Sequence, residues 1–215
     1  MNLQKLSKHR QPQVGEQVYQ TVLNLIIEGD ISAGEFIPIS SLSEALNVSN
    51  TPIREALSKL KNDGIIIKIP YKGYKVREFD KGSIKEIYEC RAIIEGYACK
   101  LTAEKVGNDT IINLIDLQHK GESLLARGDL ENYRIYNENL HKMIINKSQN
   151  NQLIKMFNNI DKIVRVLASA TINISGRPQK AIKEHKNIID AIKNRNSNKA
   201  RKIMEDHILS VLKDL

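Results

Sequence analysis

Residues 65–76 carry the only pattern in this chain that is typical of β-strands. Residues 65–69 form a β-branched run, residues 70–73 have the composition of a tight turn, and residues 74–76 return as a second short strand. Elsewhere, apolar residues recur every three or four positions, which is the period of an α-helix. The sequence therefore predicts a mostly α-helical protein with one short β-hairpin.

Three helical segments precede the hairpin, after a polar stretch over residues 1–12 that predicts a loose arm. The predicted segments are residues 14–28, residues 42–47 behind a capping box of Ser41 and Glu44, and residues 52–63. Three helices followed by a two-stranded hairpin form a winged helix-turn-helix, whose third helix lies in the major groove of DNA. We therefore expect residues 1–78 to be a DNA-binding domain.

The predicted DNA contacts lie on the outer face of the third helix, at its start and at the hairpin tip. They are Ser49, Asn50, Thr51, Arg54, Ser58, Lys72 and Gly73. Free N–H groups at a helix start suit a phosphate, and an arginine such as Arg54 reaches a guanine or a phosphate. The net charge of +8 is spread over the chain, but residues 50–77 hold seven Lys and Arg against two acidic residues.

Residues 79–215 contain no strand pattern and predict an all-helical bundle. We expect about six helices, at residues 83–105, 109–127, 129–147, 150–173, 177–194 and 197–213, separated by Gly- and Asn-rich breaks. Two domains suit a chain of 215 residues. The second domain is expected to bind an effector and to form a homodimer.

The two cysteines, Cys90 and Cys99, predict a reducing compartment. Nine residues on one helix place them about 13 Å apart, too far for a disulfide within the chain. We expect both to be buried free thiols in a cytoplasmic protein. No long apolar run predicts a membrane span, and the N-terminus has no signal-peptide core.

Three histidines, His141, His185 and His207, lie on the apolar faces of three separate predicted helices. One inward histidine is usually an ordinary core residue. Three that converge in a helical bundle form a good site for Zn, Ni or a similar divalent ion. The sequence alone leaves open whether they converge, and we interpret His9 and His119 as surface residues.

Residues 14–78 resemble the N-terminal domain of the GntR family of bacterial regulators. The segments that carry the resemblance are GDISAGE (29–35), LSEALNVS (42–49), TPIREAL (51–57) and LKNDG (60–64). This resemblance implies a transcription repressor or activator that binds double-stranded operator DNA. The family usually has Arg where this chain has Asn50, so Asn50 indicates a different operator and favours adenine.

Residues 83–213 resemble the FCD ligand-binding domain of the FadR subfamily. The segments that carry this resemblance are RAIIE (91–95), NENLH (137–141), EHKNIIDAI (184–192) and MEDHI (204–208). In metal-binding members an Asp four residues before the first histidine completes a three-histidine site for a divalent ion such as Zn, Ni or Mn. Here that position is Asn137, which brings no charge, and Glu138 is an alternative carboxylate ligand.

The resemblance also implies a small organic acid as effector, held between the metal and cavity arginines. Arg91 and Arg165 are the candidate carboxylate partners. For each, a simple salt bridge is the competing interpretation.

Two other functions compete with a ligand-controlled regulator. A di-iron oxidase needs a Glu-x-x-His pair on each of two helices, and only Glu138 with His141 fits, so we expect no enzymatic activity. A constitutive DNA-binding dimer, whose helical domain senses nothing, remains an alternative because of Asn137.

Overall fold

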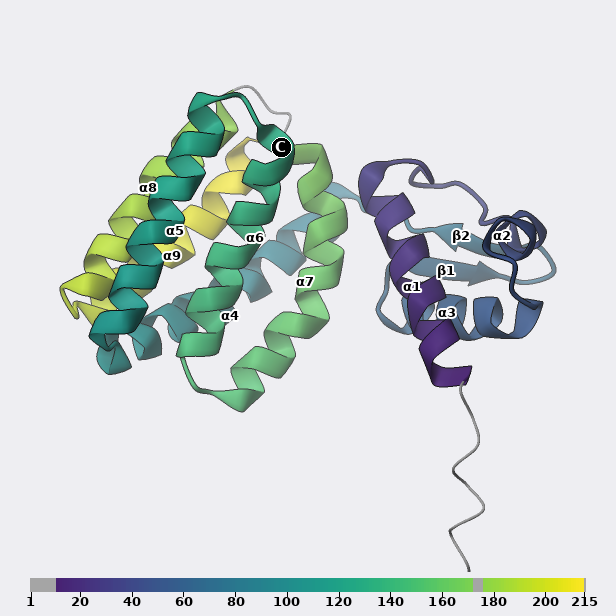
Figure 1. Cartoon of the computed structure of the whole chain (residues 1–215), viewed down its shortest axis with the longest axis horizontal. Helices are drawn as coiled ribbons and strands as arrows, with labels where there is room; N and C mark the ends of the chain where they lie inside the picture. Colours follow the sequence, from purple (N-terminus) through teal and green to yellow (C-terminus); the bar gives the residue numbers. More distant parts are fainter. Residues whose placement is uncertain (1–10, 172–175, 215) are drawn as a thin grey trace, which may run out of the picture. The chain divides into compact units, whose positions relative to one another are not determined.

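The computed structural model describes residues 11–171 and 176–214, without side-chain detail at 11–13 and 168–171. The chain divides into two compact units, one ending at Phe79 and the other beginning at Asp80 (Figure 1). Each unit has its own buried core.

The first unit consists of three helices and a hairpin. Its elements are α1 (Gln11–Glu28), α2 (Ile39–Leu46), α3 (Asn50–Asn62), β1 (Ile66–Ile69) and β2 (Gly73–Val76). The strands are antiparallel, with Ile66 opposite Val76. The inner face of α3, which packs against α1, buries Ile53, Leu57 and Leu60 completely. The predicted order of three helices and a hairpin is confirmed.

The start of α2 differs from the prediction. The helix begins at Ile39, so Ser41 lies inside it and the predicted capping box with Glu44 is wrong. The backbone N–H of Ile37 donates to the carbonyl of Tyr74 (2.9 Å). This hydrogen bond holds the loop beside β2 as far as Ile37. The helix therefore starts directly after Pro38. Of the predicted arm, residues 11 and 12 belong to α1 and the others lie outside the described residues.

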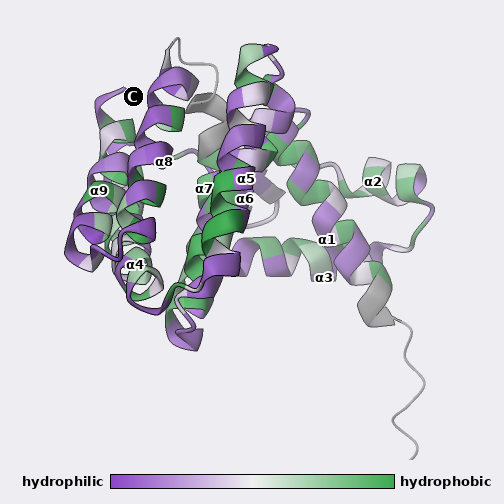
Figure 2. Ribbon diagram, turned by 60° about the vertical axis from the view of Figure 1, so that its left-hand side comes forward, coloured by the Kyte–Doolittle hydropathy of each residue, from purple (hydrophilic) through white to green (hydrophobic). Residues whose placement is uncertain are grey.

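The second unit is entirely helical, as the sequence predicts. Its helices are α4 (Lys81–Lys105), α5 (Asn108–Ala126), α6 (Leu130–Lys147), α7 (Asn151–Thr171), α8 (Arg177–Lys193) and α9 (Ser197–Ser210), followed by a 3-10 turn (Val211–Lys213). Helices α4, α5, α6 and α9 carry hydrophobic and hydrophilic residues together (Figure 2), which is typical of amphipathic helices that surround a core. Side chains at three helix starts, Asp80, Asp129 and Asn196, accept backbone N–H groups as caps.

Helices α6, α8 and α9 all contribute to one core in the second unit, in which α6 packs mainly against α4 and α5. Helix α4 runs along α9 and also contacts α6, while α8 packs between α5 and α9. Leu140, Ile144, Ile188 and Met204 are completely buried at the centre of this arrangement. The three helices that carry the candidate histidines therefore share one core.

Both cysteines are free thiols. Cys99 is buried, as expected, but Cys90 is exposed, so the prediction of two buried thiols is wrong for Cys90. Position 90 lies on the outward face of α4, opposite the face that contains Ala92 and Cys99. Separately, none of the helices in the described part of the chain is both long and apolar enough to cross a lipid bilayer.

Candidate functional site

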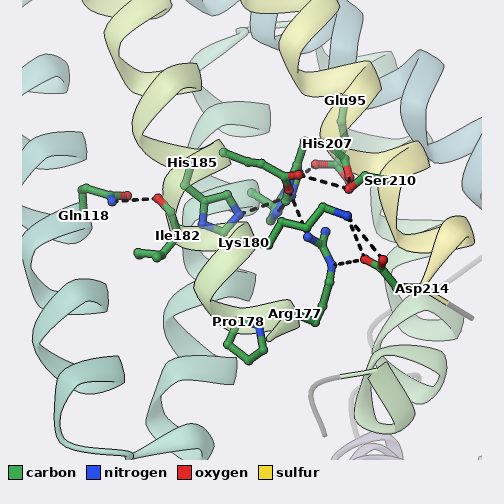
Figure 3. A network of polar contacts seen from close by, with 12 residues as sticks. Glu95, Gln118, Arg177, Pro178, Lys180, Ile182, His185, His207, Ser210 and Asp214 are labelled. Carbon is green, nitrogen blue, oxygen red and sulfur yellow. Dashed lines mark hydrogen bonds and ion pairs between the residues drawn. The ribbon is translucent and has the colours of Figure 1, made fainter. Parts of the chain in front are cut away.

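The imidazole rings of His141, His185 and His207 meet inside the helical unit. The rings come from α6, α8 and α9, and all three are buried. The Nε2 atom of His207 lies 3.2 Å from Nε2 of His185 and 3.3 Å from Nε2 of His141. Figure 3 shows His185 and His207 pointing toward each other. The convergence that the sequence left open is therefore present.

The opposite ring nitrogen of each histidine has its own acceptor. Nδ1 of His207 donates to Glu184 (2.6 Å), and Nδ1 of His141 donates to the buried Glu95. Nδ1 of His185 lies 3.1 Å from the hydroxyl oxygen of Tyr136. These partners fix the orientation of each ring and direct all three Nε2 atoms toward a common point.

The Tyr136 contact also fixes the tautomer of His185. The Tyr136 hydroxyl donates its proton to Oε1 of Gln118 (3.0 Å), and Nε2 of Gln118 donates to the carbonyl of Ile182 (3.0 Å). The Tyr136 oxygen is therefore an acceptor for His185, whose Nδ1 must carry the hydrogen. Consequently Nε2 of His185 has a free lone pair.

The electrostatics of the cluster favour neutral rings at His185 and His207 and charged carboxylates at Glu184 and Glu95. Burial lowers the pKa of His207 to about 4, although the hydrogen bond to Glu184 opposes this effect. Burial, with the neighbouring histidines, holds the pKa of His185 well below its usual value. Burial would raise the pKa of Glu184, but His207 and Arg177 outweigh it and lower the pKa to about 2. Burial would also raise the pKa of Glu95, but Arg91 and His141 outweigh it and lower the pKa to about 2.

A cavity of about 70 Å³ opens beside His141 and His207. Its lining comes from α4, α6, α8 and α9 and from the turn that follows α9: Tyr88, Arg91, Tyr133, Arg134, Asn137, His141, Arg177, Pro178, Ala181, His207 and Val211. Since one water needs about 10–15 Å³ of such volume, the cavity has room for roughly five to seven waters, or one small organic molecule.

The predicted effector arginines differ in position. Arg91 lines the cavity and forms a buried pair with Glu95. Arg165 is not part of the lining; its Nε lies 3.1 Å from Glu138, so the salt-bridge interpretation fits Arg165. Glu138 also pairs with Arg134 (2.9 Å) and is not among the groups that converge with the three histidines. Glu138 is therefore not placed to replace Asn137 as a ligand.

Sequence analysis missed Arg134 and Arg177 as cavity residues. Arg177 is buried, with Nη1 3.0 Å from Glu184 and Nε 3.5 Å from Asp214. Figure 3 shows Arg177 and Lys180 directed at Asp214. At the start of a predicted helix, an arginine beside Gly176 and Pro178 looks like a surface residue, whereas the folded unit buries it beside Glu184 and Asp214.

In the first unit, the predicted DNA contacts lie at the surface. Ser49, Asn50, Thr51, Arg54, Ser58 and Lys72 are exposed, and Gly73 is half-buried. Ser49 is the residue that precedes α3, in extended conformation, as expected for a helix start. Among the described residues, Arg54 forms no ion pair, so its guanidinium is free to contact a ligand.

Two family models together match most of this chain. Residues 14–76 match the model of bacterial regulatory proteins of the gntR family, and residues 86–210 match the FCD domain. The chain belongs to the GntR family, in its FCD branch. It is therefore a transcriptional regulator rather than an enzyme, and the di-iron oxidase alternative is excluded.

Individual GntR relatives match along most of their length. The HTH-type regulator YdhC of Bacillus subtilis is 24% identical over 90% of this chain and 85% of its own. The HTH-type transcriptional repressor RspR of Escherichia coli is 20% identical over 92% and 87%. The solved structure of E. coli McbR/YncC superposes with a TM-score of 0.75 at 22% identity, covering 93% of this chain and 97% of its own, and shows a shared fold.

Gly121 of this GntR regulator gives a test of the Tyr136 contact. A Cβ at Gly121, in α5, would overlap the Tyr136 ring. A Gly→Ala change inside a helix normally stabilises by about 1 kcal/mol. Here we expect Gly121→Ala to lower the free energy of unfolding by about 1–3 kcal/mol, because overpacking displaces the ring that holds His185. Urea unfolding followed by circular dichroism measures the change.

The matched control is Gly82→Ala in the first turn of α4. A Cβ there is 3.4 Å from the exposed Asp80 carboxylate, an ordinary contact. This variant should unfold at the same urea concentration as the wild type or slightly higher. If Gly121→Ala were as stable as Gly82→Ala, the packing of Tyr136 against α5 would be wrong.

Proposed function

We propose that this protein binds operator DNA under the control of a small organic acid, which binds beside a divalent metal ion in the helical domain. The protein acts in the cytoplasm as a homodimer. Each of its two subunits consists of a DNA-binding domain, residues 1–78, and a helical domain, residues 79–215. The observation that carries the proposal is the group of three Nε2 atoms, 3.2 and 3.3 Å apart, next to a cavity lined by arginines.

The arrangement of the three histidines fits a metal ion. Two nitrogen ligands that each lie about 2.1 Å from one ion, with an angle of roughly 100° at the ion, are themselves about 3.2 Å apart. The observed distances between Nε2 atoms, 3.2 and 3.3 Å, match this separation. Each Nδ1 donates to an acceptor, so the three Nε2 lone pairs face one another in a buried space without a hydrogen to share. A cation relieves that repulsion. Neutral imidazole suits Zn, Ni and, less strongly, Mn.

The residues of the histidine cluster and of the neighbouring cavity have distinct roles in the proposed site. His141, His185 and His207 hold the ion, and Asn137, one helical turn before His141, is the fourth candidate through its carbonyl oxygen. A bound ion supplies a Lewis acid for the carboxylate of the effector. Arg91 lines the same space and offers a guanidinium to the acid.

In the DNA-binding domain, α3 enters the major groove and the hairpin tip contacts the backbone or minor groove. Ser49, Asn50 and Thr51 lie at the helix start, where N–H groups and hydroxyls suit phosphate or base edges. Arg54 and Ser58 lie on the exposed side of α3, and Lys72 and Gly73 at the hairpin tip. In a homodimer, two such helices reach successive major grooves of a pseudo-palindromic site.

The proposal is tested by two measurements on the same purified protein without a histidine tag. Elemental mass spectrometry should find close to one Zn, Ni or Mn per chain. DNA selected by the protein from a random library should then change its affinity when metal and organic acids are added. If operator affinity were unchanged at saturating acid and metal, the constitutive DNA-binding dimer would be the better description.

A further inference from the structure

Tyr71, at the tip of the hairpin, is the most exposed large hydrophobic side chain among the residues that the structure describes. Its ring stands fully in solvent and, within the described part of the chain, has no hydrogen-bond or aromatic partner. The fold therefore gains no packing energy from this side chain.

The backbone at Tyr71 is strained. Its φ is +61°, in the left-handed region that glycine and asparagine adopt most easily. The backbone N–H of Lys72 donates to the carbonyl of Ile69 (3.2 Å) and closes a turn with Pro70 and Tyr71 at its centre. Proline followed by a residue of positive φ is the pattern of a type II turn, in which the second of these positions favours glycine. A strained residue that adds no packing points to a function.

The surroundings of Tyr71 are basic. Residues 64–77 contain four Lys and Arg and no Asp or Glu. Lys68 and Lys72 lie on either side of Tyr71 in the sequence, and both are exposed. The hairpin tip therefore carries an uncovered aromatic ring within a positively charged segment, which suits a nucleic acid better than an apolar protein surface.

The direction of the hairpin relates Tyr71 to α3. Strand β1 begins four residues after α3 ends and packs against that helix. Figure 1 shows the hairpin extending toward the end of this unit at which α3 begins. When the start of α3 enters a major groove, the tip is thus placed to reach the minor groove beside it.

The minor groove suits a single tyrosine. It is about 6 Å wide, half the width of the major groove, so it admits side chains rather than a helix. An A·T pair presents only hydrogen-bond acceptors there, whereas a G·C pair adds a projecting amino group. A tyrosine hydroxyl can donate to such an acceptor, and the narrow groove of A·T-rich DNA attracts lysines such as Lys72.

We propose that Tyr71 is a specificity-determining residue, whose ring enters the minor groove and whose hydroxyl donates to N3 of adenine or O2 of thymine. The inference rests on the proposed contacts of α3 and the hairpin tip with operator DNA, and adds a preference for A·T pairs beside the positions that α3 contacts. Arg54→Ala tests α3 separately, so the failure of one proposal is distinguishable from the failure of the other.

The test uses the full-length protein and the DNA that the wild type selects from a random library. In this DNA, 2,6-diaminopurine replaces adenine at one pair at a time, which adds an amino group in the minor groove and leaves the major-groove edge unchanged. Fluorescence anisotropy at one salt concentration measures the affinity. We expect at least one replacement to weaken wild-type binding about fivefold or more, as a mismatched base pair does.

Tyr71→Phe and Tyr71→Gly should both bind the unmodified DNA about fivefold or more weakly than the wild type, and the sensitive pair should no longer respond to diaminopurine. Tyr71→Gly should also unfold at the same temperature as the wild type or higher, because glycine relieves the strain at a positive φ. A purely structural role would instead lower stability and affinity together.

The matched control is Tyr97→Phe, which removes the hydroxyl of another exposed tyrosine, on α4. This variant should bind the selected DNA as tightly as the wild type and keep the response to diaminopurine.

Three results would overturn the inference. If both Tyr71 variants bound as tightly as the wild type, Tyr71 would not contact DNA, although the contacts of α3 would stand. If they bound more weakly but kept the response to diaminopurine, Tyr71 would contact only the sugar–phosphate backbone. If no A·T pair of the wild-type site responded to diaminopurine, the proposed contact with base edges would be wrong.

Discussion

His207→Ala should lower the zinc affinity of the protein by more than about 100-fold, since changes to the outer shell of a metal site alone cost 10- to 100-fold. His207 is the central member of the cluster, because its Nε2 contacts both other Nε2 atoms. Without it two imidazoles remain, and Glu184 loses a hydrogen bond. Zinc content after loading in succinate and dialysis, determined by elemental mass spectrometry, should fall from near one per chain to a trace.

The control for His207→Ala is His119→Ala, which removes an exposed histidine from α5. This variant should keep the zinc content of the wild type. Zinc should also raise the midpoint of thermal unfolding of the wild type and His119→Ala, because a ligand that binds only the folded state stabilises it. If His207→Ala kept one zinc per chain and the same thermal shift, the metal would lie elsewhere.

Much of this site is predictable from helical periodicity. His141, His185 and His207 each lie among apolar neighbours at intervals of three or four residues, and such positions face the core. Their convergence is not predictable from the pattern, because it depends on which faces of α6, α8 and α9 pack together. The alternative of three separate core histidines fits the same sequence.

The residues that surround the histidines were less accessible to sequence analysis. Tyr136 and Gln118 are far from His185 along the chain and meet it only through the packing of α5, α6 and α8. Glu95 and Arg91 form an i,i+4 pair that on most helices lies at the surface, but here α9 and α6 bury it. A one-dimensional charge pattern cannot distinguish an exposed pair from a buried one.

The fold itself was more predictable than the helix starts. The β-branched run and its turn were sufficient to locate the hairpin, because β1 and β2 pair locally. The start of α2 was not, since it depends on the hydrogen bond between Ile37 and Tyr74, two residues that are distant in the sequence. A tertiary contact therefore overrides the local capping signal at Ser41.

Arg54→Ala should weaken binding to the selected operator by roughly 5- to 150-fold, the equivalent of about 1–3 kcal/mol for a lost base contact. Arg54 is exposed on α3 and forms no ion pair among the described residues, so its removal should leave the fold and its stability unchanged. Fluorescence anisotropy with the DNA selected by the wild type, at one fixed salt concentration, measures the loss. Lys193→Ala, at an exposed position on α8, is the control for the loss of one positive charge.

Arg54→Lys separates the two kinds of contact that an arginine makes with DNA. Lysine keeps the charge but loses the paired donors, so it should preserve a phosphate contact and lose most of a bidentate guanine contact. A phosphate contact would also lower the slope of log affinity against log salt by about one in Arg54→Ala, whereas a base contact would relax the sequence preference at one position. If Arg54→Ala bound as tightly as Lys193→Ala, then α3 would not present this side to DNA. The assignment of Ser58, which lies one turn further along the same face, would fail with it.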